Sequence, residues 1–282
     1  MATSITLERW RTLRESLSQT GDRFATLVSS VGDPEAKAVG NWSVAETAAH
    51  VVVIASLYTT MLSAGASAHP IPGLEDRIRE SALDEVGALN EYALAHMVER
   101  DPIALGGHIR EAVGKLIAMS DDLDPSCHVT WLGGAQVPVA GWYAHLLNEL
   151  HLHGGDIARA GGERWDVPQL DAAMSFEMFL VAMLRGDTGH LLAHEPMSRS
   201  DVAIRFRSRH TAPVVLAVRD GRIVIDPSSG RLDATLYFQP AALMQILFMR
   251  LGKTRAALTG QIAVLGRKPW QLSRFLRAVR FP

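Results

Sequence analysis

The sequence has a single cysteine, Cys127, in 282 residues. One cysteine excludes a disulfide framework within the chain, a CxxC redox pair and a cysteine-rich zinc site. A basic stripe interleaved with aromatic residues is also missing, and the formal net charge is −2. Nucleic acid is therefore not expected as a partner.

Long hydrophobic runs are missing as well. The longest one, Val51 to Tyr58, is far too short to span a bilayer, and the first residues do not have the form of a signal peptide. We therefore expect a cytoplasmic protein with no membrane partner. Hydrophobic residues make up 48% of the chain and charged residues 21%, which is enough apolar material for one large domain or two small ones.

Helical periodicity dominates the first two-thirds of the chain. A capping box, Ser43-Val44-Ala45-Glu46, predicts the start of a helix that continues to about residue 61. A short hairpin or extended segment is expected over about 127–139, where two apolar runs flank Gly133-Gly134. The other helices are predicted from apolar spacing and from proline and glycine stop signals at about 6–31, 82–100, 102–119, 139–160 and 170–184.

The pattern changes from residue 201 onward. Period-two alternation predicts strands over about 202–209, 214–217, 222–226 and 234–238, with a turn signal at Asp220-Gly221. Helical patterns follow over about 240–251 and 269–279. Strands followed by helices in one block indicate a small α+β domain.

The helix over 139–160 carries the most informative constellation. Trp142, Leu146, Glu149, His153 and Ile157 recur at intervals of three or four, so they share one face. Because this face is otherwise apolar, it should point into the protein core. A carboxylate and an imidazole are costly there unless they are paired or coordinate a metal.

His50 lies on a similar apolar stripe of the earlier helix, together with Ile54, Leu57 and Met61. Buried histidines are often hydrogen-bonded core residues rather than ligands. Spacing alone leaves both readings of these three polar residues open.

Two runs resemble a known family. Asn41-Trp42-Ser43-Val44-Ala45-Glu46-Thr47-Ala48-Ala49-His50-Val51 resembles the W-[ST]-x-x-[DE]-x-x-x-H signature of mycothiol-dependent maleylpyruvate isomerases. Residues 149–161 resemble the E-x-x-x-H-x-x-D-[IL]-A-x-A-x-G pattern of the same family, and the resemblance covers about residues 6–162. The C-terminal segment resembles a sterol-carrier-protein-2-like (SCP2-like) domain, through residues 233–238 and a following helix with residues 256–266.

The resemblance implies a DinB/YfiT-like four-helix bundle with a divalent metal, most often zinc, on three protein ligands. At the matching positions of this sequence the ligands are His50, Glu149 and His153. It also implies that the metal activates mycothiol for attack on a small electrophile. Isomerase and S-transferase activities share that first step, so the choice between them stays open.

Other polar residues near these three are weaker candidates for the metal site. Asp156 follows His153 by one helical turn, and could orient that ligand or pair with Arg159. His145 is a reserve ligand that is expected to be partly exposed, and His151 is expected to face solvent. Trp42 should pack at the entry of its helix as a hydrophobic staple.

Several further residues of reactive or charged types are expected to have structural rather than catalytic roles. Cys127 and His128 point to opposite sides of an extended segment, so a nucleophile-base dyad is not expected and the cysteine is read as structural. The alternating arginines Arg205, Arg207 and Arg209 are read as a solvated sheet face, and the pair His190 and His194 as linker residues.

The sequence therefore predicts an α+β protein with a metal-binding helical bundle at 1–165, a helix and connector at 166–200 and an SCP2-like domain at 201–282. The predicted function is mycothiol-dependent isomerase or S-transferase, with a cleft between the domains as the substrate entrance. Two alternatives remain. One is a carrier of lipids or hydrophobic ligands with a structural metal, and the other is a metal-free regulatory bundle.

Overall fold

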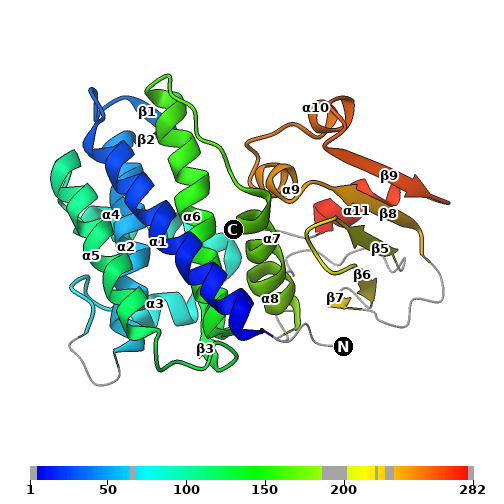
Figure 1. Cartoon of the computed structure of the whole chain (residues 1–282), viewed down its shortest axis with the longest axis horizontal. Coiled ribbons are helices and arrows are strands. Elements are labelled where there is room, and N and C mark those ends of the chain that lie inside the picture. The colour runs from blue at the N-terminus through cyan, green and yellow to red at the C-terminus, as the bar shows by residue number, and fades with distance from the viewer. Residues whose placement is uncertain (1–4, 64–67, 186–201, 220–221, 226–231, 279–282) are drawn as a thin grey trace.

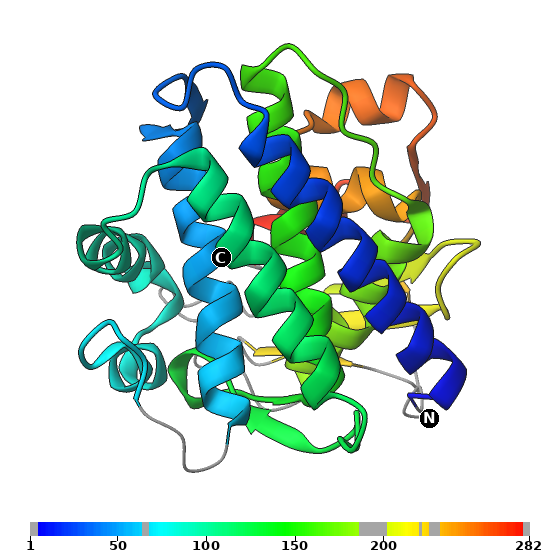
Figure 2. The ribbon, with the colours of Figure 1, turned by 60° about the vertical axis from the view of Figure 1, so that its left-hand side comes forward.

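The computed structural model describes residues 5–63, 68–185, 202–219, 222–225 and 232–278. Four long helices dominate its N-terminal part. Helix α1 packs against α5 and α6, and α2 packs against the same two partners, so the four form a closed bundle (Figure 2). These helices are α1 (Leu7–Ser29), α2 (Val44–Leu62), α5 (Pro102–Met119) and α6 (Val139–Ala160).

The start of α2 is fixed by the predicted capping box. The Ser43 hydroxyl accepts a hydrogen bond from the Glu46 backbone N–H at 3.2 Å, and the Glu46 carboxylate accepts one from the Ser43 N–H at 2.9 Å. Two backbone donors that the helix itself cannot satisfy are thereby paired. This cap places His50 on the second turn of α2, with its side chain toward the bundle interior.

The segment between α2 and α5 differs from the prediction. A single helix was expected over 82–100, whereas the structure has α3 (Leu74–Glu80), the 3₁₀ turn η1 (Leu83–Glu85) and α4 (Val86–His96). Gly73 adopts the left-handed conformation (φ 63°) just before α3, and Ser81 is extended just after it. These short helices lie outside the four-helix ring beside α2 (Figure 2).

Two small hairpins flank the bundle helices. The strands β1 (Lys37–Val39) and β2 (Trp42–Ser43) precede α2, and β3 (His128–Thr130) and β4 (Gln136–Pro138) precede α6. The second pair confirms the hairpin expected over 127–139. Between its strands lies the 3₁₀ turn η2 (Leu132–Gly134).

A helical segment joins the bundle to the C-terminal sheet (Figure 1). The helix predicted over 170–184 is present as α7 (Gln169–Met174), the π-helical turn η3 (Ser175–Val181) and α8 (Ala182–Arg185). Phe179 of η3 packs against Trp131 with ring centroids 4.9 Å apart, and Phe176 packs against Phe238 of the sheet at 5.2 Å. One continuous set of buried apolar residues therefore extends from the bundle into the sheet.

The C-terminal part is a mixed five-stranded sheet with helices, so the α+β fold class is confirmed. The strand order is β7-β6-β5-β8-β9, with β5 and β8 parallel and the other neighbours antiparallel. The bounds are β5 (Val202–Arg207), β6 (Val214–Arg219), β7 (Arg222–Ile225), β8 (Ala234–Phe238), α9 (Pro240–Leu247), α10 (Lys253–Leu258), β9 (Ile262–Gly266) and α11 (Gln271–Ala278).

The helix expected over 256–266 is present only at its start, since α10 ends at Leu258 and residues 262–266 form a strand. The chain leaves α10 at Thr259, passes through Gly260 at φ 69° and continues as the edge strand β9, which pairs with β8. Alternation of Ile262, Val264 and the intervening residues suits a half-buried strand. His190, His194 and the turn at Asp220-Gly221 lie outside the described residues.

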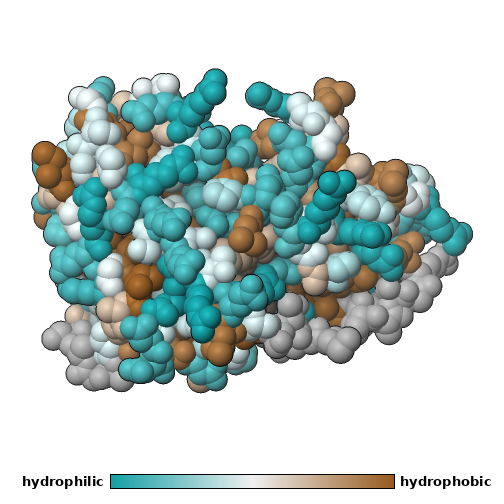
Figure 3. All heavy atoms as spheres, viewed as in Figure 1, coloured by the Kyte–Doolittle hydropathy of each residue, from teal (hydrophilic) through white to brown (hydrophobic). Residues whose placement is uncertain are grey.

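Among the described residues, α2 is the one helix long and apolar enough to cross a membrane by composition. In the fold 67% of its most apolar window is buried, which is typical of the core helix of a bundle. On the face shown in Figure 3, hydrophilic side chains cover much of the bundle and hydrophobic ones are scattered among them.

The α1–α5 contact yields a stability prediction. A Cβ added at Gly106 would lie 2.8 Å from the Ala25 carbonyl oxygen and 2.2 Å from the Ser29 hydroxyl, so Gly106→Ala must push the helices apart. We expect it to lower the free energy of unfolding by about 1–3 kcal/mol, as overpacking does, measured by urea denaturation.

The adjacent Gly107 is the matched control. No atom lies within 4 Å of a Cβ built there, so Gly107→Ala should raise the free energy of unfolding by about 0.5–1 kcal/mol. Equal effects of the two substitutions would contradict the close approach of α1 and α5.

Candidate metal centre

One face of α6 carries polar residues into the bundle. Glu149 and His153 are both buried and lie one turn apart, at 8% and 6% exposure. Their apolar neighbours on the same stripe, Leu146 and Ile157, are fully buried. As the helical spacing predicts, Glu149 and His153 share one face of α6, and this face brings a carboxylate and an imidazole into the interior together.

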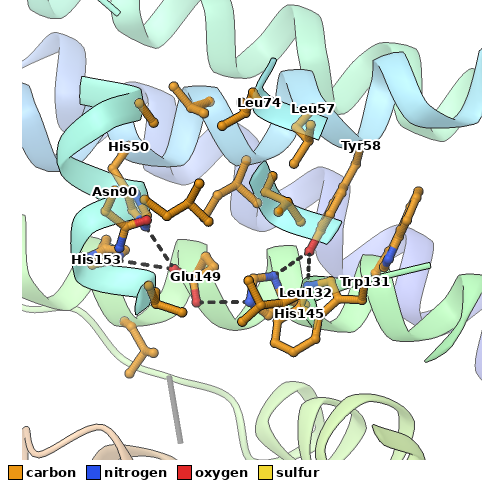
Figure 4. Close-up of a pocket in the computed structure, with 18 of the residues that line it drawn as sticks. His50, Leu57, Tyr58, Leu74, Asn90, Trp131, Leu132, His145, Glu149 and His153 are labelled. Atoms are coloured by element: carbon orange, nitrogen blue, oxygen red, sulfur yellow. Dashed lines mark hydrogen bonds and ion pairs between the residues drawn. The ribbon is translucent and has the colours of Figure 1, made fainter. Parts of the chain in front are cut away.

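The third residue of the group comes from α2. His50 Nε2 lies 3.5 Å from Glu149 Oε2, and His153 Nε2 lies 3.3 Å from the same oxygen. The two imidazole rings are 5.1 Å apart and nearly perpendicular. Figure 4 shows both side chains directed at Glu149, His50 from α2 and His153 from α6, the helix of Glu149 itself.

The spacing of these donor atoms fits a metal ion. All three offer a ligand atom within 4.8 Å of the others. Nitrogen and oxygen donors at 2.0–2.2 Å from a tetrahedral zinc lie roughly 3.3–3.5 Å from one another, and the contacts above have this length. The group could therefore bind a metal, with His50 and His153 offering Nε2 and Glu149 a carboxylate oxygen.

Burial and mutual contact set the charges in the group. Burial lowers the pKa of His50 and would raise that of Glu149, but the contacts of Glu149 with His153, His50 and His145 together outweigh burial and hold the Glu149 pKa well below its usual range. The pKa of His153 is raised, since its contacts with Asp156 and Glu149 outweigh the opposing effect of burial. The group therefore contains a firmly ionised carboxylate, the form that binds cations.

Asp156 supports His153 from behind. Its Oδ2 lies 3.3 Å from His153 Nδ1 and accepts a hydrogen bond from Arg250 Nη2 at 2.8 Å, while its Oδ1 accepts one from Arg159 Nη2 at 2.8 Å. Both readings of Asp156 from the sequence are therefore realised at once. Burial would raise the Asp156 pKa, yet the contacts with His153 and Arg250 hold it below its usual range.

A second polar chain meets the other oxygen of Glu149. His145 Nε2 lies 3.6 Å from Glu149 Oε1, and His145 Nδ1 shares a 2.8 Å hydrogen bond with the Tyr58 hydroxyl. The Trp131 indole N–H donates to that hydroxyl at 3.1 Å. Figure 4 shows this series of contacts from Trp131 to Glu149. It orients Oε1 of the carboxylate, whereas His50 and His153 contact Oε2.

The group opens onto a cavity of about 370 Å³. Helices α2, α3, α4 and α6 and the β3–β4 hairpin supply most of its walls, and Phe248 and Arg250 reach it from the C-terminal part. The exposed Gly40 and Asn41 lie at its edge. The cavity is large enough for a small organic ligand.

Several sequence-based expectations about individual residues are wrong. His145 is buried rather than partly exposed, and it lines the cavity. His151 is 2% exposed and shares a 2.8 Å hydrogen bond with Asp171 on α7, because α7 covers the face of α6 that the sequence alone left open. Cys127 is exposed, not a buried structural cysteine.

Other expectations hold or need extension. His128 is also exposed and neither it nor Cys127 lines the cavity, so no dyad forms there. Arg207 and Arg209 are exposed as predicted for a solvated face, with Arg205 half-buried. Trp42 lies at the entry of α2, and its ring centroid is 5.0 Å from that of His50. The sequence alone did not indicate this contact, nor the contacts of Tyr58, Trp131 and Arg250 around the group.

Comparison with known proteins gives one family and one fold. The sequence profile of the DinB superfamily matches residues 16–157. A crystal structure of the mycothiol-dependent maleylpyruvate isomerase aligns with a TM-score of 0.50 at 15% identity over 92% of each chain. A histidine-to-alanine mutant of a mycothiol-dependent maleylpyruvate isomerase aligns at 0.45 and 15% identity, covering 82% of this chain and 86% of its own. None of the curated proteins compared with the chain matches it.

The contacts of Asp156 yield a prediction. Asp156→Asn removes the charge that holds Arg250 and orients the His153 ring, so we expect affinity for zinc to fall about 10–100-fold. The measurement is a zinc titration against a competing chelator.

Asp171→Asn is the matched control. Asp171 is a second buried aspartate that contacts a histidine of α6, His151, which lies outside the metal group. We expect that variant to be less stable but to bind zinc with unchanged affinity. An equal loss of affinity in both variants would show that Asp156 acts only through folding.

Proposed function

Because this chain belongs to the DinB superfamily, we propose that it is a metal-dependent enzyme that activates a low-molecular-weight thiol for addition to a small electrophile. The observation that carries the proposal is the convergence of His50, Glu149 and His153 on the wall of a ligand-sized cavity. A purely structural site would have no need of such a cavity. The fold likeness to the mycothiol-dependent maleylpyruvate isomerase supports mycothiol as the thiol.

The residues present suit a divalent metal, most often zinc in a donor set of two imidazoles and one carboxylate. When bound, such an ion supplies the positive charge that keeps a thiol deprotonated near neutral pH and leaves room for it, since three protein donors do not complete the coordination. His50 from α2 and Glu149 and His153 from α6 would hold the ion. Asp156 orients His153, and the apolar cavity walls exclude water.

The reaction begins with bond formation between the thiol sulfur and an electrophilic carbon. In an addition to a carbon–carbon double bond, the π electron pair moves to the neighbouring carbon, which takes up a proton. For an isomerase, rotation about the new single bond and loss of that proton and of the thiol regenerate the double bond, so no thiol is consumed. For an S-transferase the sulfur–carbon bond remains. Both activities share the first step and therefore the same residues.

The alternative of a lipid carrier has less support. It predicts an apolar tunnel within residues 201–282, whereas the cavity is lined mainly by the bundle, and that part of the chain contributes Phe248 and Arg250. The alternative of a metal-free regulatory bundle requires that the three polar residues satisfy one another. Their contacts of 3.3–3.5 Å are long for charge-assisted hydrogen bonds.

Metal analysis tests the first half of the proposal. Protein purified without chelators should contain close to one equivalent of zinc or a similar divalent metal, measured by plasma mass spectrometry. Less than about half an equivalent, also after incubation with zinc and desalting, would exclude the metalloenzyme.

A variant tests whether the group is the site. His153→Ala should abolish metal retention and reduce thiol consumption or isomerisation to background, measured with mycothiol and either maleylpyruvate or generic electrophiles. His108→Ala, a change at an exposed histidine of α5, should change neither. Retained metal with full activity in His153→Ala would show that the assignment is wrong.

A further inference from the structure

The cavity beyond the metal group is strongly apolar. Residues of α2, α3, α4 and η2 form its walls, and Figure 4 shows several of them between His50 and Trp131. Helices α3 and α4 lie outside the four-helix ring and close the cavity on that side. The apolar residues that matter most here are Leu57, Met61, Leu74, Ile78, Leu89 and Leu132.

Some of these side chains are not fully covered by protein. Met61, Ile78 and Leu89 are half-buried and pack against the core on one side while they line the cavity on the other. Apolar surface that faces a cavity favours a ligand which removes it from water. A preformed cavity of about 370 Å³ suits the body of a small organic molecule.

Charged groups in the cavity are few and already matched. Among the described residues that line it, Arg250 is the one arginine or lysine, and its guanidinium contacts both oxygens of Asp156, at 3.4 and 2.8 Å. Glu149 adds a negative charge. Maleylpyruvate carries two carboxylates, each of which needs a cationic or hydrogen-bonding partner on burial. The apolar side chains of the walls offer neither, and the hydrogen-bonding side chains Asn41, Asn90 and Thr130 that also line the cavity carry no charge.

We propose that the electrophile of this enzyme is an uncharged molecule with an apolar body that occupies the cavity between α2, α3 and α4. This inference rests on the proposed function and specifies its substrate class. A 2-alkenal serves as the example. The thiol sulfur bonds to carbon 3, the π pair moves toward carbon 2, and carbon 2 takes up one proton in place of the proton that the thiol lost. The product is a saturated thioether aldehyde.

Binding is tested apart from chemistry with saturated 2-alkanones of five to eleven carbons, which cannot add a thiol. Trp42, Trp131 and Trp142 line the cavity, so tryptophan fluorescence reports occupancy. We expect the dissociation constant to fall roughly fourfold per methylene until the cavity is full. Fumarate, a dicarboxylate, should bind at least about 100-fold more weakly than the best alkanone. Affinity that does not depend on chain length, or preference for fumarate, would overturn the proposal.

A charge placed in the wall tests the location. Leu89→Lys should weaken the binding of the best alkanone at least about tenfold, whereas Leu258→Lys, the same change at a side chain 84% exposed on α10, should leave it unchanged. Thermal unfolding of both variants checks that a loss of binding does not come from a folding defect. Unchanged binding in Leu89→Lys, with thermal unfolding showing a folded protein, would place the ligand elsewhere.

Turnover measurements distinguish a failure of the substrate class from a failure of the proposed function. With mycothiol and zinc-loaded protein, turnover of 2-alkenals should rise with chain length and exceed that of maleylpyruvate. Chain-length-dependent alkanone binding without thiol turnover of any electrophile would refute the proposed function and leave the cavity as a site for apolar ligands. Turnover of maleylpyruvate with no alkanone binding would refute the substrate class and leave the thiol chemistry intact.

Discussion

The burial of Glu149 between helices is the constraint on which the rest of the centre depends. An ionised carboxylate in an apolar interior costs several kcal/mol unless other groups compensate for it. Here compensation comes from His50 and His153 at one oxygen and from His145 at the other. The helix α2 must approach α6 at that level to supply His50, and the Ser43–Glu46 cap sets the point along α2 where this histidine lies. The packing of α2 against α6 therefore also sets the positions of the polar residues around Glu149.

The same requirement extends outward in two directions. Asp156 balances His153 and is itself balanced by Arg159 and Arg250. On the other side, Tyr58 and Trp131 complete the hydrogen bonds of His145. Each added polar group contacts the next until the series reaches the protein surface or the C-terminal part, and the contact of His153 Nδ1 with Asp156 is an ion pair at 3.3 Å rather than a hydrogen bond. Polar contacts of this kind orient the side chains that they join, which suits a centre that must hold ligands in place.

Local signals in the sequence account for most of the bundle. The capping box before α2, the proline at the start of α5 and the stripe of Leu146, Glu149 and His153 each act within one or two turns, so they can be read without tertiary information. Because His50, Glu149 and His153 are polar residues on otherwise apolar faces of α2 and α6, the same spacing also indicates them as candidate ligands. Their convergence could not be derived from spacing and came from the family resemblance.

The errors share a physical cause. His145 and His151 were assigned to edges of α6 because the sequence does not show that the β3–β4 hairpin and α7 cover those faces. The local pattern over β9 does not predict a strand, because the pairing of β9 with β8 depends on residues more than twenty positions earlier. Arg250 is separated from Asp156 by 94 residues, and no local pattern connects them. Long-range pairing, rather than local propensity, sets all of these positions.

The contact between Asp156 and Arg250 also has a thermodynamic consequence. Arg250 belongs to the C-terminal part, Asp156 belongs to the bundle, and His153 of the candidate metal group lies against the same carboxylate. Binding of an ion to the candidate metal group and association of the two parts of the chain would then be linked equilibria. By reciprocity, whatever factor the docked C-terminal part adds to ion affinity, a bound ion adds to docking. The second part of this chain would thus contribute to the affinity of the first part for an ion, although it supplies none of the three candidate ligands.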